Sequence, residues 1–274
     1  MISVLNSVSQ LGAENALSST QASLQNTLLQ LSTGLKINSG SDDAAGLSIA
    51  SGLGASISAL TQSSQNAANG IGFAQTADGA LSQVTSLLNR AVTLATEAAN
   101  GGLTTDQASA AQAEYTSILT EIGTIGSTTN FNGSSVFTAA GNTVFTSDGT
   151  AAGNSTVTVA PGLLTAAGLK LSSAATALTT TGAATTELAA ITAAIDTVSA
   201  TRGSIGASVN QLTAAENVEN TQVTNLTSAQ NSVQNADISS TVAKMTQYNV
   251  LEQTGMAALS QSNQAQQAVL KLLQ

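Results

Sequence analysis

A seven-residue apolar repeat, with alternating steps of three and four residues, occupies the C-terminal third of the sequence. Residues three or four apart lie on one face of an α-helix, and strict heptads over more than about 25 residues are typical of helices packed as coiled coils. The repeat shifts by one residue at 235–237, where Asp237 can cap a new helix. We therefore predict two long helices, one ending near residue 234 and one beginning near Ile238.

Both frames of the repeat are mainly apolar and include some polar members. The first frame comprises Leu188, Ile191, Ile195, Val198, Arg202, Ile205, Val209, Leu212, Glu216, Glu219, Val223, Leu226, Gln230 and Val233. The second frame comprises Ile238, Val242, Met245, Asn249, Glu252, Met256, Leu259, Asn263, Gln266, Leu270 and Leu273. The Glu residues on the helices are expected to be mostly solvated or to form pairs between helices.

The N-terminal segment carries a similar stripe of leucines at spacings of seven, four, three and four: Leu17, Leu24, Leu28, Leu31 and Leu35. The stripe predicts a helix that stops in the Gly/Ser-rich stretch 38–41. Asp42 and Asp43 follow, where a new helix needs an N-cap and negative charge in its first turn. A helix cap explains this pair better than a metal site does, because Ala44-Ala45-Gly46 adds no further ligand.

Long seam-forming helices are therefore expected at both termini. We predict that they contribute an assembly seam, although the same stripes would also suit an intramolecular bundle. Burial of one seam stabilises these segments by less than the cost of ordering their backbones. We therefore expect the terminal segments to be disordered in the monomer and to fold as copies join. The predicted seam comprises Leu24, Leu28, Leu31, Leu35, Ile238, Val242, Met245, Met256, Leu259, Leu270 and Leu273.

Two more helices are predicted in the first half of the chain. One contains a four–three stripe over residues 73–98 and ends at Gly101-Gly102. The other begins with a capping box at residues 104–107, carries an apolar stripe and extends to Gly126.

The character of the sequence changes between residues 128 and 186, where glycines recur. Two short β-branched runs, 143–146 and 156–159, flank the turn pair Asp148-Gly149 and predict a small β-hairpin. The expected fold class is therefore mainly α, with long paired N- and C-terminal coiled-coil-like helices and a small central β-hairpin excursion.

Charge is unusually scarce in this chain. Charged residues make up 8% of the sequence, compared with roughly 25% in an ordinary soluble domain. A surface so poor in charge favours association. The formal net charge is −9, and the basic residues are scattered singly, so neither nucleic acid nor an anionic membrane is an expected partner. The six basic residues are Lys36, Arg90, Lys170, Arg202, Lys244 and Lys271.

The absence of Cys and His excludes thiolate nucleophiles, disulfides, Cys/His zinc sites and imidazole bases. We expect neither enzymatic activity nor a cofactor or metal site. The N-terminus has no basic segment followed by a continuous apolar run, so a cleaved secretory signal is not expected. No continuous run reaches the roughly 18 apolar residues that are typical of a membrane span.

Residues 31–49, LSTGLKINSGSDDAAGLSI, closely resemble the N-terminal signature of bacterial flagellins, and residues 69–81 continue the resemblance. Lys36 stands where that family usually has Arg, which keeps the charge but loses the planar guanidinium. Further similar segments lie at 129–133, 202–207, 235–237 and 262–273. The resemblance covers both ends of the chain and omits only its middle.

The resemblance implies a subunit that self-assembles into the helical flagellar filament used for swimming. It also implies three parts: an inner domain of 1–41 with 235–274 lining the filament channel, an outer helical domain of 42–130 with 185–234 in the filament wall, and a reduced, β-rich, solvent-facing insertion at 131–184. Implied partners are other copies, an export chaperone, the filament cap and the hook–filament junction proteins. Export to the extracellular flagellum would occur without a cleaved signal peptide.

In some flagellins, the stretch that matches residues 89–95 is recognised, together with Glu114, by an animal innate-immune receptor. Arg90, Leu94 and Glu114 are present here, but uncharged residues occupy positions 92 and 93, where strongly recognised members carry charge. The resemblance therefore makes these three residues a candidate receptor epitope. Packing within the helical domain is the alternative role for Leu94.

Three other classes of protein fit this sequence less well. A hook–filament junction protein shares flagellin-like ends and is the nearest alternative. A trimeric coiled-coil adhesin would have parallel, uninterrupted heptads, unlike this chain. A hydrolase of the kind that some flagellins carry as a zinc protease in the insertion would need His, which the sequence lacks.

Overall fold

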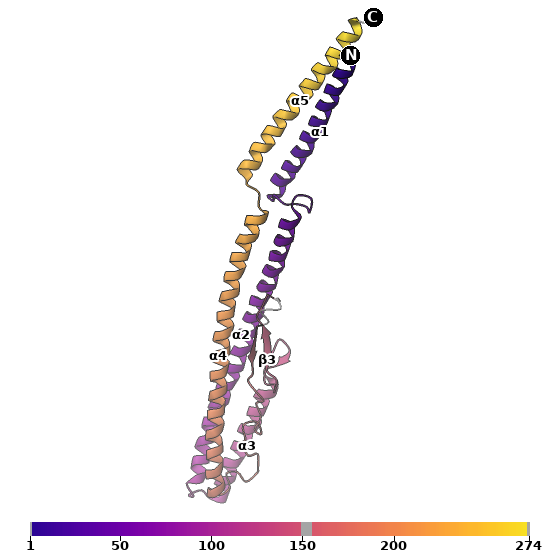
Figure 1. The fold of residues 1–274 in the computed structure, drawn as a ribbon. Helices are drawn as coiled ribbons and strands as arrows, with labels where there is room; N and C mark the ends of the chain where they lie inside the picture. The colour runs from indigo at the N-terminus through magenta and orange to yellow at the C-terminus, as the bar shows by residue number, and fades with distance from the viewer. Residues whose placement is uncertain (1, 149–154, 273–274) are drawn as a thin grey trace. The chain divides into compact units, whose positions relative to one another are not determined.

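The computed structural model describes residues 2–148 and 155–272 (Figure 1). Its elements are α1 (Ile2–Thr33), α2 (Ala44–Ala99), α3 (Thr105–Thr128), β1 (Asn130–Phe131), β2 (Ser134–Ser135), β3 (Asn142–Phe145), β4 (Thr156–Val159), α4 (Thr181–Gln234) and α5 (Ile238–Leu272). The mainly α fold class, with long terminal helices and short central strands, is confirmed. Gly149 of the predicted turn pair and Leu273 of the predicted seam lie outside the described residues.

The helices begin where the sequence places their caps. The Asp43 carboxylate accepts a hydrogen bond of 2.9 Å from the Gly46 amide at the start of α2. The Asp237 carboxylate accepts hydrogen bonds from the amides of Ser239 and Ser240, at 2.9 and 3.2 Å, at the start of α5. These contacts satisfy amides that the first turn of a helix otherwise leaves unpaired. The caps at Asp43 and Asp237 are confirmed, whereas the Asp42 carboxylate accepts hydrogen bonds from the Asn38 and Ser39 amides in the preceding loop.

The capping box of α3 is also confirmed. The Thr104 hydroxyl accepts a hydrogen bond from the Gln107 amide, and the Gln107 side chain accepts one from the Thr104 amide. Asp106 adds negative charge in the first turn, where it interacts favourably with the helix dipole.

Thr104→Ala is expected to reduce the free energy of unfolding by about 1 kcal/mol, because it removes one side of this box. For a domain of this size, the melting temperature would fall by roughly 2–4 °C, measured by circular dichroism. Thr105→Ala, one residue further on, removes the same atoms without removing the cap and serves as the control. Equal shifts for the two variants would contradict the capping role.

The chain forms two compact units. The terminal unit comprises Met1–Ala55 and Asn225–Gln274, and the central unit comprises Ser56–Thr224. Helices α2 and α4 contribute to both units. The predicted three-part division into inner domain, outer domain and insertion stays a prediction.

Helices α2, α3 and α4 and the strand pairs form one hydrophobic core in the central unit. Figure 1 shows α3 and β3 alongside α2 and α4. The largest apolar side chains buried almost completely in this core are Leu81, Val84, Leu88, Tyr115, Ile122, Val136, Val159, Leu178, Ile191, Val198 and Leu212. The heptad stripes of the sequence supply part of this core, and residues outside them, such as Leu81, Leu88 and Val136, supply the rest.

The segment between α3 and α4 contains two antiparallel strand pairs, β1 with β2 and β3 with β4. The first pair, which the sequence reading missed, turns at Asn132 and Gly133, whose φ angles of 50° and 78° suit a two-residue hairpin. This segment was expected to face solvent, but one side of it packs into the core. Val144, Val159 and Leu178 are among its buried residues. Apolar side chains thus fix a segment whose composition suggested an exposed insertion.

Two buried polar side chains hold the end of this segment against the helices. Gln112 on α3 donates to the Ala174 carbonyl and accepts from the Leu178 amide. Glu187 on α4 accepts hydrogen bonds from the Ser172 amide and from the Tyr115 hydroxyl. Burial and the nearby Glu187 carboxylate raise the pKa of Tyr115, so the phenol stays protonated as the donor.

Two Glu residues of α4, Glu187 and Glu219, are buried and pair with hydroxyl groups on other helices rather than with solvent. Glu219 on α4 is 4% exposed, and its Oε1 atom accepts a hydrogen bond of 2.7 Å from Ser63 on α2. Burial raises the pKa of this carboxyl above its ordinary value of 4.5, the Ser63 hydrogen bond opposes the shift, and the charge of Glu216 adds to it.

We expect the central unit to become more stable as the pH falls through the folded-state pKa of Glu219 towards 4.5. In this window the folded state binds the proton more tightly than the unfolded state does, so unfolding becomes less favourable on acidification. Thermal melts between pH 7 and 5 would measure the slope. Glu219→Gln should flatten it, and an unchanged slope would contradict the assignment to this carboxyl. The pKa values of Asp78 and Glu114 are lowered, so their contributions are lost only at lower pH.

Helix α2 contains an 18-residue window with a mean hydropathy of 1.4, of which 17% is buried. By length and composition alone it could cross a membrane. A single such helix is weak evidence, since the core helices of proteins that never enter a membrane meet the same criterion.

Candidate assembly surface

Helices α1 and α5 of the terminal unit pack along one another in opposite directions (Figure 1). Gln10 donates a hydrogen bond of 3.1 Å to the Asn263 side chain, and Gln21 donates one of 3.2 Å to the Glu252 carboxylate. The two helices are therefore antiparallel. The predicted pairing of the N- and C-terminal helices is confirmed.

The loops at the near ends of α1 and α5 are joined by backbone hydrogen bonds. The Lys36 amide donates to the Gln234 carbonyl, and the Ala236 amide donates to the Gly34 carbonyl, both at 2.8 Å. Gly34 has a φ of 73°, which favours glycine. This short antiparallel bridge fixes which residues of α1 and α5 lie opposite each other.

The predicted seam residues divide into two groups. Five are half-buried: Leu24, Leu31, Leu35, Met245 and Leu259. Four are exposed: Leu28, Ile238, Val242 and Met256. Leu270 lies in α5, but its side chain and the whole of Leu273 lie outside the described residues. The stripe read from the sequence therefore does not form a single buried seam within one chain.

The α1–α5 pair buries few side chains of its own. Among the described side chains of these two helices, only Thr27 and Thr241 are buried, and neither is an apolar residue. Each helix instead satisfies its threonine locally, because both hydroxyls bond to a carbonyl four residues earlier. Packing between two such helices gives little hydrophobic stabilisation.

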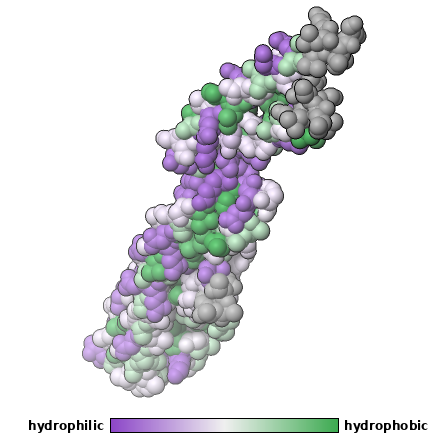
Figure 2. Space-filling model, turned by 45° about the horizontal axis from the view of Figure 1, so that its top comes forward, coloured by the Kyte–Doolittle hydropathy of each residue, from purple (hydrophilic) through white to green (hydrophobic). Residues whose placement is uncertain are grey.

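Large apolar side chains are concentrated on the surface of this terminal unit. Of the thirteen exposed ones among the described residues, only Phe145, Leu163 and Val218 lie in the central unit. The other ten are Val8, Leu11, Leu28, Leu29, Ile49, Ile238, Val242, Val250, Leu251 and Met256. Figure 2 shows green apolar patches interrupting the polar surface of the molecule. Such a concentration marks an interaction surface.

Sequence reasoning missed six of those ten residues. Leu29 and Leu251 were missed because they lie outside the strict heptad positions, although each directly follows another apolar residue, Leu28 or Val250. Apolar residues just outside a strict heptad widen the apolar face of a helix beyond a single seam. Adjacent apolar pairs such as Leu28-Leu29 and Val250-Leu251 could have indicated this wider apolar face from the sequence.

Two shallow grooves lie along the α1–α5 pair. One has a volume of about 400 Å³ and is lined by Leu17, Leu251 and Gly255, among others. The second has a volume of about 530 Å³ and includes Met256 and Leu259. The described residues that line them include no charged side chain. Another apolar helix face could therefore cover them without burying a charge.

The candidate receptor epitope is only partly at the surface. Arg90 and Glu114 form a bidentate ion pair, with the Nε–Oε1 distance at 2.7 Å, and both side chains are exposed. The hydrogen bond and charge of Arg90 lower the pKa of Glu114. The Leu94 side chain is 3% exposed and belongs to the core. The structure thus brings Arg90 and Glu114 together at the surface and buries Leu94 in the core.

Within residues 2–148 and 155–272, no three acidic side chains are grouped so that they could hold a metal ion.

The two ends of the chain match two family models: residues 4–142 match the bacterial flagellin N-terminal helical region, and residues 188–273 match the C-terminal helical region. A flagellin from Listeria monocytogenes is 30% identical over 264 residues, covering 89% of this chain and 90% of that protein. A flagellin from Serratia marcescens is 42% identical over 140 residues, covering 51% of this chain. The crystal structure of a Bacillus cereus flagellin aligns with a TM-score of 0.49 and 26% identity, over 56% of this chain and 88% of that one.

The matched length differs among these relatives. The matched region makes up 40% of the Serratia flagellin and 25% of a flagellin from Salmonella muenchen. The fold and surface define a protein of long helices whose paired termini expose apolar residues. The chain belongs to the bacterial flagellin family.

Proposed function

We propose that this chain is the structural subunit of a bacterial flagellar filament that drives swimming. The observation that carries the proposal is the concentration of exposed large apolar side chains on the terminal unit, in a member of the flagellin family. Copies would join through heterologous, head-to-tail contacts that do not close into a ring, which generates a helical fibre. The comparisons favour this role over that of a hook–filament junction protein.

In this proposal, α1 and α5 form the inner part of the filament. Exposed residues such as Leu28 and Met256 become buried against neighbouring copies, and the half-buried ones such as Leu24 stay within the α1–α5 pair. The terminal segments lose disorder as copies join, since one chain alone buries little in them. The filament wall is formed by residues 42–130 with 185–234. The segment 131–184 packs one side on the core and turns its other side outward to solvent.

The proposed partners follow from the same role. They are other copies of the chain, an export chaperone for the C-terminal segment, the filament cap and the hook–filament junction proteins. The subunit would reach the extracellular flagellum through the flagellum-specific apparatus without a cleaved signal peptide. Its role is structural rather than enzymatic. Arg90 and Glu114 are the epitope residues available to an innate-immune receptor at the surface.

Purified full-length chain is expected to polymerise when short filament fragments are added as seeds. Light scattering would follow elongation, and electron microscopy would identify helical filaments. The same chain without seeds is the control, because nucleation should be slow compared with elongation. Failure of the seeded chain to elongate at any concentration would overturn the proposed function.

A further inference from the structure

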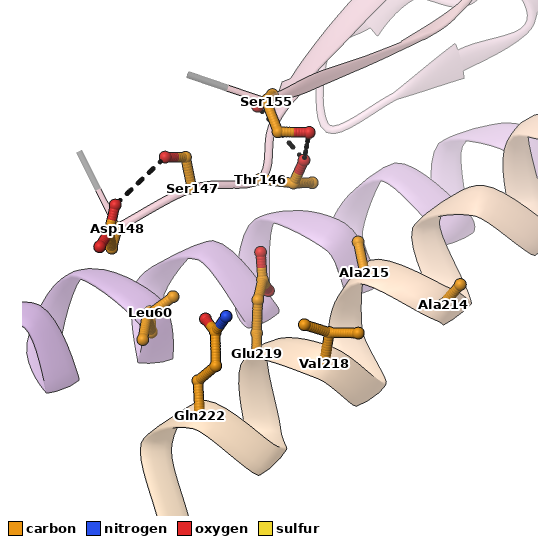
Figure 3. A pocket seen from close by; sticks show the side chains of 10 residues that line it. All are labelled: Leu60, Thr146, Ser147, Asp148, Ser155, Ala214, Ala215, Val218, Glu219 and Gln222. Atoms are coloured by element: carbon orange, nitrogen blue, oxygen red, sulfur yellow. Dashed lines mark hydrogen bonds between the residues drawn. The ribbon is translucent and has the colours of Figure 1, made fainter. Parts of the chain in front are cut away.

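A cavity of about 530 Å³ lies in the central unit, between the helices and the inner ends of the β3–β4 pair (Figure 3). Leu60 comes from α2, and Glu219 and Gln222 rise from α4. Ser147 and Asp148 follow β3 on the opposite side of the cavity. The cavity therefore combines an apolar floor with hydroxyl, amide and carboxylate groups.

One carboxylate oxygen in this cavity has no partner. Glu219 is 4% exposed, and its Oε1 atom accepts the hydrogen bond from Ser63. Its Oε2 atom is buried with no hydrogen-bond partner among the described residues. An unsatisfied buried oxygen of a charged group is costly, so a hydrogen-bond donor from outside the chain would stabilise it.

The charges around the cavity make it suitable for a cation. Glu216, one turn earlier on α4, and Asp148, across the cavity, are both acidic. The two arginines of the central unit are engaged elsewhere, since Arg90 pairs with Glu114 and Arg202 pairs with Asp78 at 2.7 Å. Among the described residues that line the cavity, none is cationic.

The same unit presents one lysine that has no salt bridge within the described residues. Lys170 is exposed and has a φ of 58°, a backbone conformation that is uncommon for residues other than Gly, Asn and Asp. It lies between Leu169 and Leu171, which are both buried in the core. Backbone hydrogen bonds from Leu169 to Thr165 and from Lys170 to Ala167 close the turn. This anchored turn fixes the backbone from which the exposed Lys170 side chain projects.

Lys170 cannot reach the cavity of its own chain. Two residues further on, the Ser172 amide is bonded to Glu187 on α4 at 2.9 Å. Glu187 and Glu219 are 32 residues apart on that single helix, which corresponds to roughly 48 Å at 1.5 Å per residue. A lysine side chain and two residues of backbone span far less than this distance. Lys170 and the Glu219 cavity thus lie far apart within the central unit.

We propose that the cavity at Glu219 receives Lys170 of a second copy of this chain. The inference rests on the proposed head-to-tail assembly, in which different patches of successive copies meet. The ammonium group would donate hydrogen bonds to Glu219 Oε2 and to the Asp148 carboxylate, while the lysine stem packs on Leu60 and Val218. The unpaired Glu219 oxygen thereby gains a hydrogen bond only in the polymer, and this hydrogen bond stabilises the assembled state.

Seeded polymerisation of full-length variants tests this pairing through the critical concentration. Glu219→Gln and Lys170→Gln are each expected to raise it about tenfold, the change that corresponds to about 1.4 kcal/mol of lost binding. The double variant should be no worse than either single variant, because both remove the same contact. Lys170→Arg, which keeps the charge, should stay near the wild-type value.

Thermal melts of the monomers separate this effect from misfolding. Glu219→Gln should melt at or above the wild-type temperature, since it removes an unsatisfied charge, while it polymerises less well. Glu121→Gln, which neutralises an exposed carboxylate on α3, is the matched control and should change neither quantity.

Carbodiimide coupling of assembled filaments, followed by mass spectrometry, should yield a Lys170–Glu219 or Lys170–Asp148 cross-link that is absent from monomers. Coupling of these carboxylates to a different lysine would overturn the inference. Wild-type critical concentrations for both Gln variants, or an additive loss in the double variant, would overturn it as well, with the proposed function intact. Failure of the wild-type chain to elongate from seeds would instead overturn the proposed function and, with it, this pairing.

Discussion

A chain that ends at Gln234 is expected not to elongate filament seeds at any concentration at which the full chain does. Removal of residues 235–274 deletes α5 and leaves α1 without its intramolecular partner. It also removes exposed apolar residues such as Val242, Leu251 and Met256. Each large apolar side chain buried on assembly contributes about 1.5–3 kcal/mol, so the loss of several exceeds what elongation can tolerate.

The truncated chain should nevertheless keep a folded central unit. The core residues lie between Ala67 and Leu212, outside the deleted segment. Its cooperative thermal transition is therefore expected within a few degrees of that of the full chain. Normal filaments grown from the truncated chain would refute assembly through the termini. A lost transition would instead show that α5 is needed for folding, and shorter deletions beginning at Met256 would then measure assembly alone.

Local signals explain why three helix starts could be predicted, whereas α1 ends at Thr33, before the stretch 38–41 where its end was predicted. Asp43, Thr104 and Asp237 each stand one residue before a helix, and a cap needs only residues close to it in sequence. The Asn132-Gly133 turn has the same local character and could have been read from the sequence. It was missed because a strand pair of two residues per strand leaves almost no alternating pattern.

Which face of a helix is covered could not be read from the repeat. Leu24 and Leu28 belong to one stripe, yet the first is half-buried and the second is 46% exposed. Their difference depends on where α5 lies, and one apolar stripe serves both a partner within the chain and one outside it.

Glu219 shows the opposite limit of the sequence reading. Its position in an apolar frame indicated burial, whereas its charged residue type indicated exposure to solvent. The side chain is buried because Ser63 lies opposite it and donates a hydrogen bond. Contacts such as Gln112 with Leu178 join residues 66 positions apart. No periodic pattern encodes such a pair, so the packing of the central segment on the core could not be predicted.

Two leucine-to-alanine substitutions are expected to separate folding from assembly. Leu212 is fully buried on α4, and its side chain lies so close to α2 that a Cβ at Gly70 would come within 3.1 Å of it. The tight contact limits collapse of the cavity that Leu212→Ala creates, so a loss of about 2–5 kcal/mol is expected. For a domain of this size the melting temperature of the monomer would fall by roughly 5–15 °C.

Leu28→Ala removes the same atoms from an exposed position on α1. The monomer should melt at the wild-type temperature, because the side chain contributes nothing to the central core. The critical concentration for seeded growth should rise by roughly 10- to 100-fold, since burial of a leucine against a neighbouring copy contributes about 1.5–3 kcal/mol. Thermal melts and sedimentation of polymer at a series of concentrations measure the two effects. If Leu28→Ala lowered the melting temperature as much as Leu212→Ala does, or polymerised at the wild-type concentration, Leu28 would not belong to the assembly surface.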